Sequence, residues 1–164
     1  VMIPNVKNAA QAKAIVDAMR YAPDGDRGLG LGGSLNDLVR PNPKEYMAAA
    51  NRNHTVICQI ESREALDNLD EIAATPGVDV LWVGHFDLTQ SLGIVGEFHD
   101  DDFLNALRRV VEVTKKNGQA AGIQPGSLEQ AREWMDIGFN MISFSADHGV
   151  YSAALRSAVD ELRG

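Results

Sequence analysis

Residues 55–83 read TVICQIESREALDNLDEIAATPGVDVLWV and contain the pattern of one strand–helix–strand unit. The runs at 55–60 and 79–83 are apolar and rich in β-branched residues, without the alternation of a half-exposed strand. Between them, Ser62 is a helix N-cap residue that precedes a helical pattern ending near Ala74. Continuous apolar runs of this kind are typical of parallel strands that are covered on both faces.

The same alternation continues on both sides of this unit. We expect further strands over residues 1–6, 120–123 and 139–144, and helices over residues 9–20, 44–51, 100–118, 127–138 and 150–162, where Ser127 and Gln130 form a capping box. Loops are predicted over residues 21–43 and 84–98. Strand and helix therefore alternate five times, which predicts a parallel α/β sheet with right-handed crossovers. The two candidate architectures are a doubly wound open sheet and a (β/α)8 TIM barrel. A whole barrel needs about 250 residues, so this chain would hold its last five βα units.

Composition excludes several classes of protein. The 164 residues are 45% hydrophobic and 23% charged, which indicates one folded domain over residues 1–164. The net charge is −8 and the Lys and Arg residues are scattered, which argues against nucleic acid or an anionic membrane as a partner. Cys58 is the only cysteine and no apolar run approaches a membrane span. A cytoplasmic location is expected.

Two carboxylates follow neighbouring strands. Glu61 comes directly after the strand over residues 55–60, and Asp87 comes four residues after Val83. The carboxyl ends of parallel strands meet at one rim, where active sites of α/β proteins lie, so we expect the two side chains to be close. They could chelate a divalent cation, act as an acid–base pair, or cap the helices that follow. The backbone after Gly84 is a candidate for N–H groups that bind an anion.

Other polar residues near strand ends carry weaker signals. Residues 28–33 contain a formal G-x-G-x-x-G, but no strand precedes it directly, so we reject dinucleotide binding. Arg27 is expected either to hold this loop or to contact an anionic ligand. His85 is predicted at the rim as a ligand-contacting or supporting residue. Asp147 is predicted mainly as a helix N-cap, and Cys58 as a core residue.

Together these segments resemble a known family. The motifs Gln59-Ile60-Glu61 and Gly84-His85-Phe86-Asp87-Leu88-Thr89-Gln90-Ser91-Leu92-Gly93 resemble the metal-binding signatures of the HpcH/HpaI aldolase/citrate lyase family. The segments at 2–9 and 27–30 are similar to that family's preceding segments, in the same order. The resemblance covers essentially the whole chain and implies a (β/α)8 barrel. By that alignment the chain begins at the fourth strand, so we expect it to be the C-terminal part of a longer barrel.

The resemblance also implies roles for individual residues. Glu61 and Asp87 match the two metal ligands, and Gln59 matches a residue that contacts the bound 2-oxo acid. The backbone N–H groups of Phe86 and Asp87 match those that hold its carboxylate. The metal would be Mg²⁺ or Mn²⁺, with Co²⁺ as a further candidate. The family's histidine base and its oxyanion-stabilising arginine lie on earlier strands, so no catalytic residue of that kind is identified in this segment. His85 stands where the family usually has proline.

The resemblance implies a class II, metal-dependent aldolase that reversibly cleaves 4-hydroxy-2-oxo acids to pyruvate and an aldehyde. The alternatives are a lyase related to citrate or malyl-CoA lyases that acts on CoA thioesters, and, if the chain is complete as given, a non-catalytic module that binds metal and a 2-oxo acid. The expected partners are the 2-oxo acid, the aldehyde and further copies of the chain, since family members are typically oligomers whose last helix packs on a neighbouring subunit.

Overall fold

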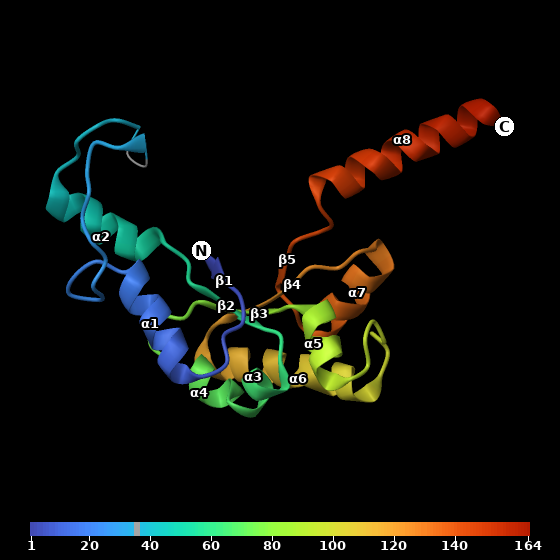
Figure 1. Ribbon diagram of the computed structural model, residues 1–164, viewed down its shortest axis with the longest axis horizontal. Helices are drawn as coiled ribbons and strands as arrows, with labels where there is room; N and C mark the ends of the chain where they lie inside the picture. Colours follow the sequence, from blue (N-terminus) through green and yellow to red (C-terminus); the bar gives the residue numbers. More distant parts are fainter. Residues whose placement is uncertain (35–36) are drawn as a thin grey trace.

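The computed structural model describes residues 1–34 and 37–164. The predicted loop over residues 21–43 contains Leu35 and Asn36, which lie outside the described residues. Within the described ranges the chain forms one parallel sheet with helices between its strands (Figure 1). The strands are β1 (Met2–Ile3), β2 (Ile57–Ile60), β3 (Val80–Val83), β4 (Ala120–Ile123) and β5 (Met141–Ile142).

The outer strands are shorter than the sequence predicted. The ladder between β1 and β2 stops at Ile3 because Asn5 turns the chain with a φ of 56° and donates its N–H to the Glu61 side chain. At the other edge β5 contains only two paired residues, and Ser145, also with a φ of 56°, ends the extended segment. The three inner strands contain four residues each, and β4 has the predicted bounds.

The strands lie in the order β1-β2-β3-β4-β5, and every neighbouring pair is parallel. A doubly wound sheet reverses its strand order at a switch point, which places helices on both faces. A strictly sequential order with right-handed crossovers places all the connecting helices on one face instead. Figure 1 shows α1 and α3 to α7 on the same side of the sheet, which is the arrangement in a (β/α)8 barrel.

The predicted helices are all present, with two corrections. The segment predicted as one helix over residues 62–74 is two short helices that meet at Asn68, whose ψ of 14° breaks the helical path. The segment predicted as a loop over residues 84–98 contains a helix, which begins after Gly84 and ends at Gly93, a left-handed C-cap with a φ of 84°. The helices are α1 (Ala9–Met19), α2 (Pro43–Asn53), α3 (Arg63–Asp67), α4 (Leu69–Ala73), α5 (His85–Leu92), α6 (Asp101–Asn117), α7 (Leu128–Ile137) and α8 (Asp147–Arg163).

Local caps fix where several helices begin. Ser62 Oγ accepts the N–H of Ala65 at 3.2 Å at the start of α3. At α7, Ser127 Oγ accepts the N–H of Gln130 at 3.1 Å, as the predicted capping box requires. The return bond differs by one residue, because Gln130 Oε1 accepts from Gly126 at 2.8 Å and not from Ser127.

The two faces of the sheet carry separate apolar clusters. Side chains such as Cys58, Ile60 and Leu81 pack against the helices in the main core. The alternate residues point to the other face, where Trp82 is only 6% exposed and covers Gly122 so closely that a Cβ there would lie 2.3 Å from the indole ring. The second cluster consists of Ile57, Val80 and Trp82, with Ala120 and Met141 against it.

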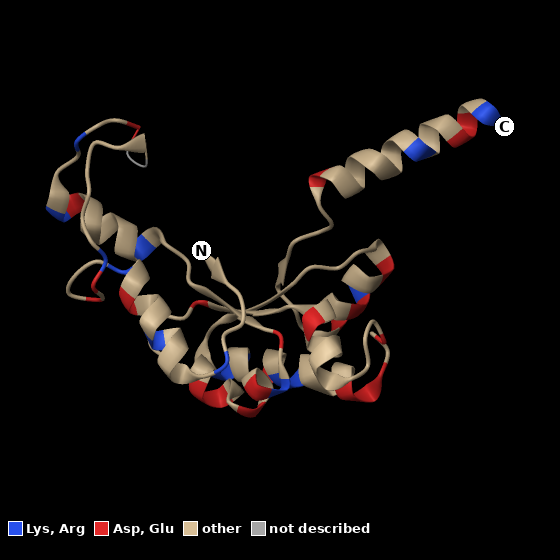
Figure 2. Cartoon of the chain, in the orientation of Figure 1, with Lys and Arg blue, Asp and Glu red and all other residues tan. Residues whose placement is uncertain are grey.

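Charged side chains are confined to helices and loops, since none of the strands contains one. Figure 2 shows Lys and Arg dispersed over α1, α2, α6 and α8 among Asp and Glu. None of the helices in the described ranges is both long and apolar enough to cross a membrane.

Candidate functional site

The ends of β2 and β3 bring the predicted site residues to one rim of the sheet. Ile60 pairs with Val83, and the N–H of Gly84 donates to the carbonyl of Ile60 at 3.1 Å. Glu61 and Gly84 are therefore adjacent across the two strands. Gln59, two residues before Glu61, points to the same face because side chains alternate along a strand.

Glu61 is a buried carboxylate that receives one hydrogen bond. It is 6% exposed, and its Oε1 accepts the backbone N–H of Asn5 at 2.7 Å. Burial raises the pKa of Glu61, the negative charge of Asp87 raises it further, and the Asn5 bond opposes both. Oε2 accepts no hydrogen bond from the residues that the structure describes.

The Glu61 and Gln59 side chains pack against the backbone of Gly84. A Cβ built on Gly84 would lie 2.3 Å from Glu61 Oε2 and 2.8 Å from Gln59 Nε2. Both polar atoms therefore lie against the same point of the backbone. Only a residue without a side chain leaves room for them, and this requirement is steric, because the φ of Gly84 is −82°.

Asp87 lies in the first turn of α5 and is exposed. Capping was one interpretation of the two carboxylates, and the structure contradicts it for both. The N-cap of α5 is Gly84, which has no side chain, and the cap of α3 is Ser62. Among residues 1–34 and 37–164 the Asp87 carboxylate receives no hydrogen bond, which leaves its oxygens available at the rim.

The first turn of α5 also presents backbone donors. Leu88 is the first residue of this turn whose N–H is bonded within the helix, to the carbonyl of Gly84 at 2.8 Å. The N–H groups of Phe86 and Asp87 precede it, so they have no partner within the helix. Such groups at a helix N-terminus favour a carboxylate or phosphate ligand. The Phe86 side chain is 59% exposed beside them.

His85 follows Gly84 at the rim and belongs to an aromatic cluster, which is compatible with the predicted supporting role. Its ring centroid lies 4.7 Å from that of Phe86 and 5.3 Å from those of both Phe98 and Trp134. Burial in this cluster lowers the pKa of His85, and the nearby charge of Asp87 partly opposes the shift. The start of α5 turns the His85 ring toward Trp134 of α7, a side chain of the core that is 0% exposed.

Arg27 lies at the other end of the strands. Its guanidinium carbon is 4.7 Å above the Tyr21 ring, and Nη1 lies 3.0 Å from His54 Nδ1. With Val1 and Thr55, which precede β1 and β2, it lines a cavity of about 570 Å³. The first of its two predicted roles, holding the loop, is the one that this geometry supports.

Two further candidates are Cys58 and Asp147. Cys58 is 0% exposed in the core, as predicted, and burial raises its pKa to about 11. Asp147 is the first residue of α8 and is exposed, and the N-cap position predicted for it belongs to Ala146. Its Oδ1 accepts the N–H of His148 at 2.7 Å.

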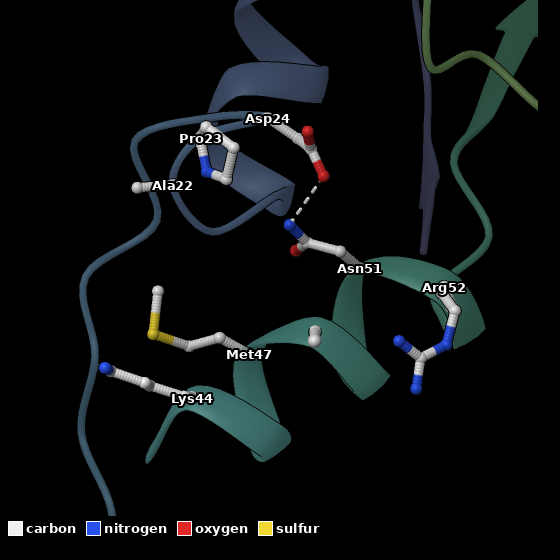
Figure 3. Close-up of a pocket in the computed structure, with 8 residues that line it drawn as sticks. Ala22, Pro23, Asp24, Lys44, Met47, Asn51 and Arg52 are labelled. Carbon is white, nitrogen blue, oxygen red and sulfur yellow. Dashed lines mark hydrogen bonds between the residues drawn. The ribbon is translucent and has the colours of Figure 1, made fainter.

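A cavity of about 500 Å³ between the loop after α1 and α2 lacks the rim carboxylates. Figure 3 shows Lys44, Met47 and Arg52 of α2 on one side and Pro23 on the other. Asn51 donates to Asp24 across it at 2.9 Å. Its lining residues come from neither β2 nor β3, so this cavity is separate from the candidate site.

The donor set at the rim fits a hard divalent cation. Two carboxylates and an amide oxygen are available, Glu61 Oε2 has no hydrogen-bond partner among the described residues, and the space beside it exists because residue 84 is glycine. In the described part of the chain no group of three or more His, Cys, Asp or Glu side chains is placed to hold a metal.

Sequence reasoning missed Asn5, the donor to Glu61. The bond comes from the backbone, which no side-chain motif reveals. The available signal was the residue type after Pro4, because asparagine tolerates a positive φ better than most residues.

Comparison with known proteins agrees with this geometry. The family model described as HpcH/HpaI aldolase/citrate lyase matches residues 1–154. A protein of Chromohalobacter salexigens named hydroxypyruvate/pyruvate aldolase is 38% identical over 99% of this chain, which covers 64% of that protein. A 5-keto-4-deoxy-D-glucarate aldolase of Enterobacter is 32% identical over 99% of this chain, which covers 62% of it.

A solved HpcH/HpaI aldolase/citrate lyase family protein from Burkholderia cenocepacia superposes with a TM-score of 0.90 and 35% identity, and the match covers 99% of this chain and 64% of that one. The chain thus spans slightly less than two thirds of the proteins that it matches. The five βα units correspond to part of their (β/α)8 barrel, as predicted. The chain belongs to the HpcH/HpaI aldolase/citrate lyase family.

Proposed function

We propose that these residues form the metal- and 2-oxo-acid-binding side of a divalent-metal-dependent aldolase, which reversibly cleaves a 4-hydroxy-2-oxo acid to pyruvate and an aldehyde. The observation that carries the proposal is the buried Glu61 carboxylate, whose Oε2 lies without a hydrogen-bond partner beside Gly84 and near Asp87. A buried carboxylate that receives a single hydrogen bond is only partly compensated, and a bound cation would compensate it further. The names of the similar aldolases support the same reaction class.

Glu61 and Asp87 would hold the cation, and the oxygen ligands favour Mg²⁺ or Mn²⁺, with Co²⁺ as a further candidate. The cation would supply positive charge beside the substrate's carbonyl oxygen, where negative charge develops during C–C cleavage. Burial of Glu61 excludes water from one side of this site, which strengthens the electrostatic interactions within it.

The remaining groups at the rim orient the substrate. The backbone N–H groups of Phe86 and Asp87 are directed by the start of α5 and would bind the carboxylate of the 2-oxo acid. The Gln59 amide also lies against Gly84 and would contact the oxo group. Donors fixed in this way need no reorganisation when charge develops, which is how preorganised sites lower a barrier.

Proton transfer needs a group that these elements lack at the rim. His85, the histidine nearest in sequence to Asp87, is packed among Phe98 and Trp134. We therefore place the histidine base and the stabilising arginine on the part of the barrel that the similar proteins have beyond the region matched by this chain.

The test is pyruvate release from a simple 4-hydroxy-2-oxo acid by the full-length protein, with Mg²⁺ or Mn²⁺ and with a chelator. Glu61→Gln and Asp87→Asn should each reduce the rate at least about 100-fold, because electrostatic stabilisation by a metal contributes several kcal/mol. Asp147→Asn is the matched control, since it removes an exposed carboxylate from the first turn of another helix.

Each outcome decides between the candidates. Metal-dependent release that both rim variants abolish supports the aldolase. Metal binding without release would favour the CoA-thioester lyase or the non-catalytic binder. The absence of both pyruvate release and metal binding would refute the proposed site.

The CoA-thioester alternative needs cations for the phosphates of CoA. In the loop after α1, Arg27 is stacked on Tyr21, bonded to His54 and lies at the end of the strands away from Glu61. This observation favours the aldolase over the lyase of CoA thioesters.

We also propose a homo-oligomer in which α8 packs on another copy. None of its residues is buried, and it projects from the sheet (Figure 1). Tyr151, Leu155 and Leu162 are 70%, 52% and 89% exposed, which is unusual for large apolar side chains on one helix. Light scattering should show an assembly that Leu155→Glu dissociates, and a monomeric wild-type protein would contradict this.

A further inference from the structure

The turn after β1 has an unusual backbone conformation, and one of its N–H groups donates to a residue of the candidate site. Asn5 adopts a left-handed conformation with a φ of 56°. Its N–H donates to Glu61 Oε1 at 2.7 Å across 56 positions of the sequence. Non-glycine residues rarely adopt this conformation, and where they do, asparagine is among the least strained.

The Asn5 side chain does not explain why this residue is present. Asn5 is exposed, and its amide makes no hydrogen bond with any residue in the described ranges. The chain on its C-terminal side is instead held by hydrogen bonds to its backbone. Val6, buried at 2% exposure, donates to the carbonyl of Gln59 at 3.3 Å, and the carbonyl of Lys7 accepts from Asn68 Nδ2 at 2.9 Å. The turn is therefore fixed to β2 immediately beside Glu61.

These contacts orient the Glu61 carboxylate from two sides. The Asn5 N–H donates a hydrogen bond to Oε1 of Glu61, and Oε2 lies in the space where a side chain at position 84 would be. One oxygen is thereby committed to the protein and the other remains available to a ligand. Loss of the Asn5 bond would leave the carboxylate free to rotate about its last torsion, which is a broad one.

We propose that Asn5 is a positioning residue whose left-handed backbone directs its N–H to Glu61 and so sets the orientation in which this carboxylate binds a divalent cation. The inference deepens the proposed function and rests on it. The backbone N–H of Asn5 has this role. Asparagine is needed at this position because it tolerates a positive φ, and not because of its amide side chain.

The experiment measures Mn²⁺ affinity by calorimetry on the full-length protein without substrate, for wild type, Asn5→Val and Asn5→Gly. Valine strongly disfavours a positive φ, so the turn should rearrange and withdraw the N–H. Residues that support metal ligands typically change affinity 10- to 100-fold when altered, so we expect Mn²⁺ binding to weaken by about tenfold or more. Glycine keeps both the conformation and the N–H, and should bind Mn²⁺ within about twofold of wild type.

Ser145→Val is the matched control, because Ser145 has the same φ of 56° but lies after β5. It introduces comparable backbone strain and should leave Mn²⁺ affinity unchanged. Weak binding by Asn5→Gly would assign the role to the side chain and overturn the inference, as would normal binding by Asn5→Val. Weak binding by Ser145→Val would attribute the loss to general destabilisation and also overturn it. If the wild-type protein binds no Mn²⁺, the proposed function fails and this inference falls with it.

Discussion

Substituting alanine for Gly84 inserts one methyl group at the most crowded point of the candidate site. The new Cβ would lie 2.3 Å from Glu61 Oε2, 2.8 Å from Gln59 Nε2 and 2.9 Å from Glu61 Cβ. Ordinary contacts begin near 3.4 Å, so the Glu61 carboxylate has to move by about 1 Å. Its Oε1 is held by Asn5, and the residue is buried, so the displacement cannot be absorbed by solvent.

The expected functional loss is much larger than the loss of stability. A displacement of about 1 Å at a reacting centre costs on the order of 100-fold in rate. Overpacking by one methyl costs about 1–3 kcal/mol in the free energy of unfolding. The backbone adds nothing to this cost, since Gly84 has a φ of −82°, which alanine adopts readily. We therefore expect a folded variant with about 100-fold slower pyruvate release and weakened Mn²⁺ binding.

The assay pairs metal-dependent pyruvate release with a urea denaturation curve. Gly126→Ala is the control, because Gly126 lies at the same rim after β4 and the nearest atom to its Cβ would be Gln130 Oε1 at 3.8 Å. It should change neither rate nor metal affinity. Unchanged kinetics in Gly84→Ala would refute the reasoning, because Glu61 and Gln59 would then have freedom that the packing denies them.

Three other predictions follow from burial. Burial raises the pKa of Glu61, so the folded chain binds the proton of this carboxyl more readily than the unfolded chain does, and it loses stability as pH rises from the ordinary carboxyl pKa through the raised value. In metal-free buffer, Glu61→Gln should therefore raise Tm at neutral pH but not at acidic pH. An equal effect on Tm at both pH values would contradict this. The Cys58 thiol, with a pKa of about 11, should resist aromatic disulfide reagents until the protein is unfolded by urea, and rapid labelling of native protein would be inconsistent with its burial. Asp79→Ala removes the 3.0 Å ion pair with buried Arg20 and the acceptor of the Val56 N–H. The free energy of unfolding, measured by urea denaturation, should fall by about 2 kcal/mol, while Mn²⁺ affinity stays constant. A change in Mn²⁺ affinity would show that the two ends of the strands are coupled.

The sequence predicted the parallel sheet because five apolar runs alternate with helical patterns, and each of them contains a strand. It left open whether the sheet is doubly wound or barrel-like. That choice depends on strand order, which a single sequence does not encode locally. The rim positions of Glu61 and Asp87 followed from their places after β2 and β3.

What the sequence did not reveal depends on side-chain direction and tertiary folding. His85 follows Gly84 at the start of α5, and only the fold shows that its ring also packs against Trp134. Of the two roles predicted for Arg27, only the fold selects the one in which it packs on Tyr21 and holds its loop. The break at Asn68 interrupts a pattern that remains amphipathic on both sides, so periodicity alone does not reveal it.

The sequential strand order also sets which parts of the sheet open first. In native-state fluctuations, segments with few buried contacts open at lower free energy than core strands. Ladders of two residue pairs hold β1 and β5, whereas β2, β3 and β4 are joined by four pairs each. Glu61 and Gly84 follow the central strands β2 and β3, but the donor to Glu61 follows the edge strand β1. Transient fraying of that edge would release the Asn5 amide while the two carboxylates stay in place, so amide exchange at Asn5 would report how often the site loosens.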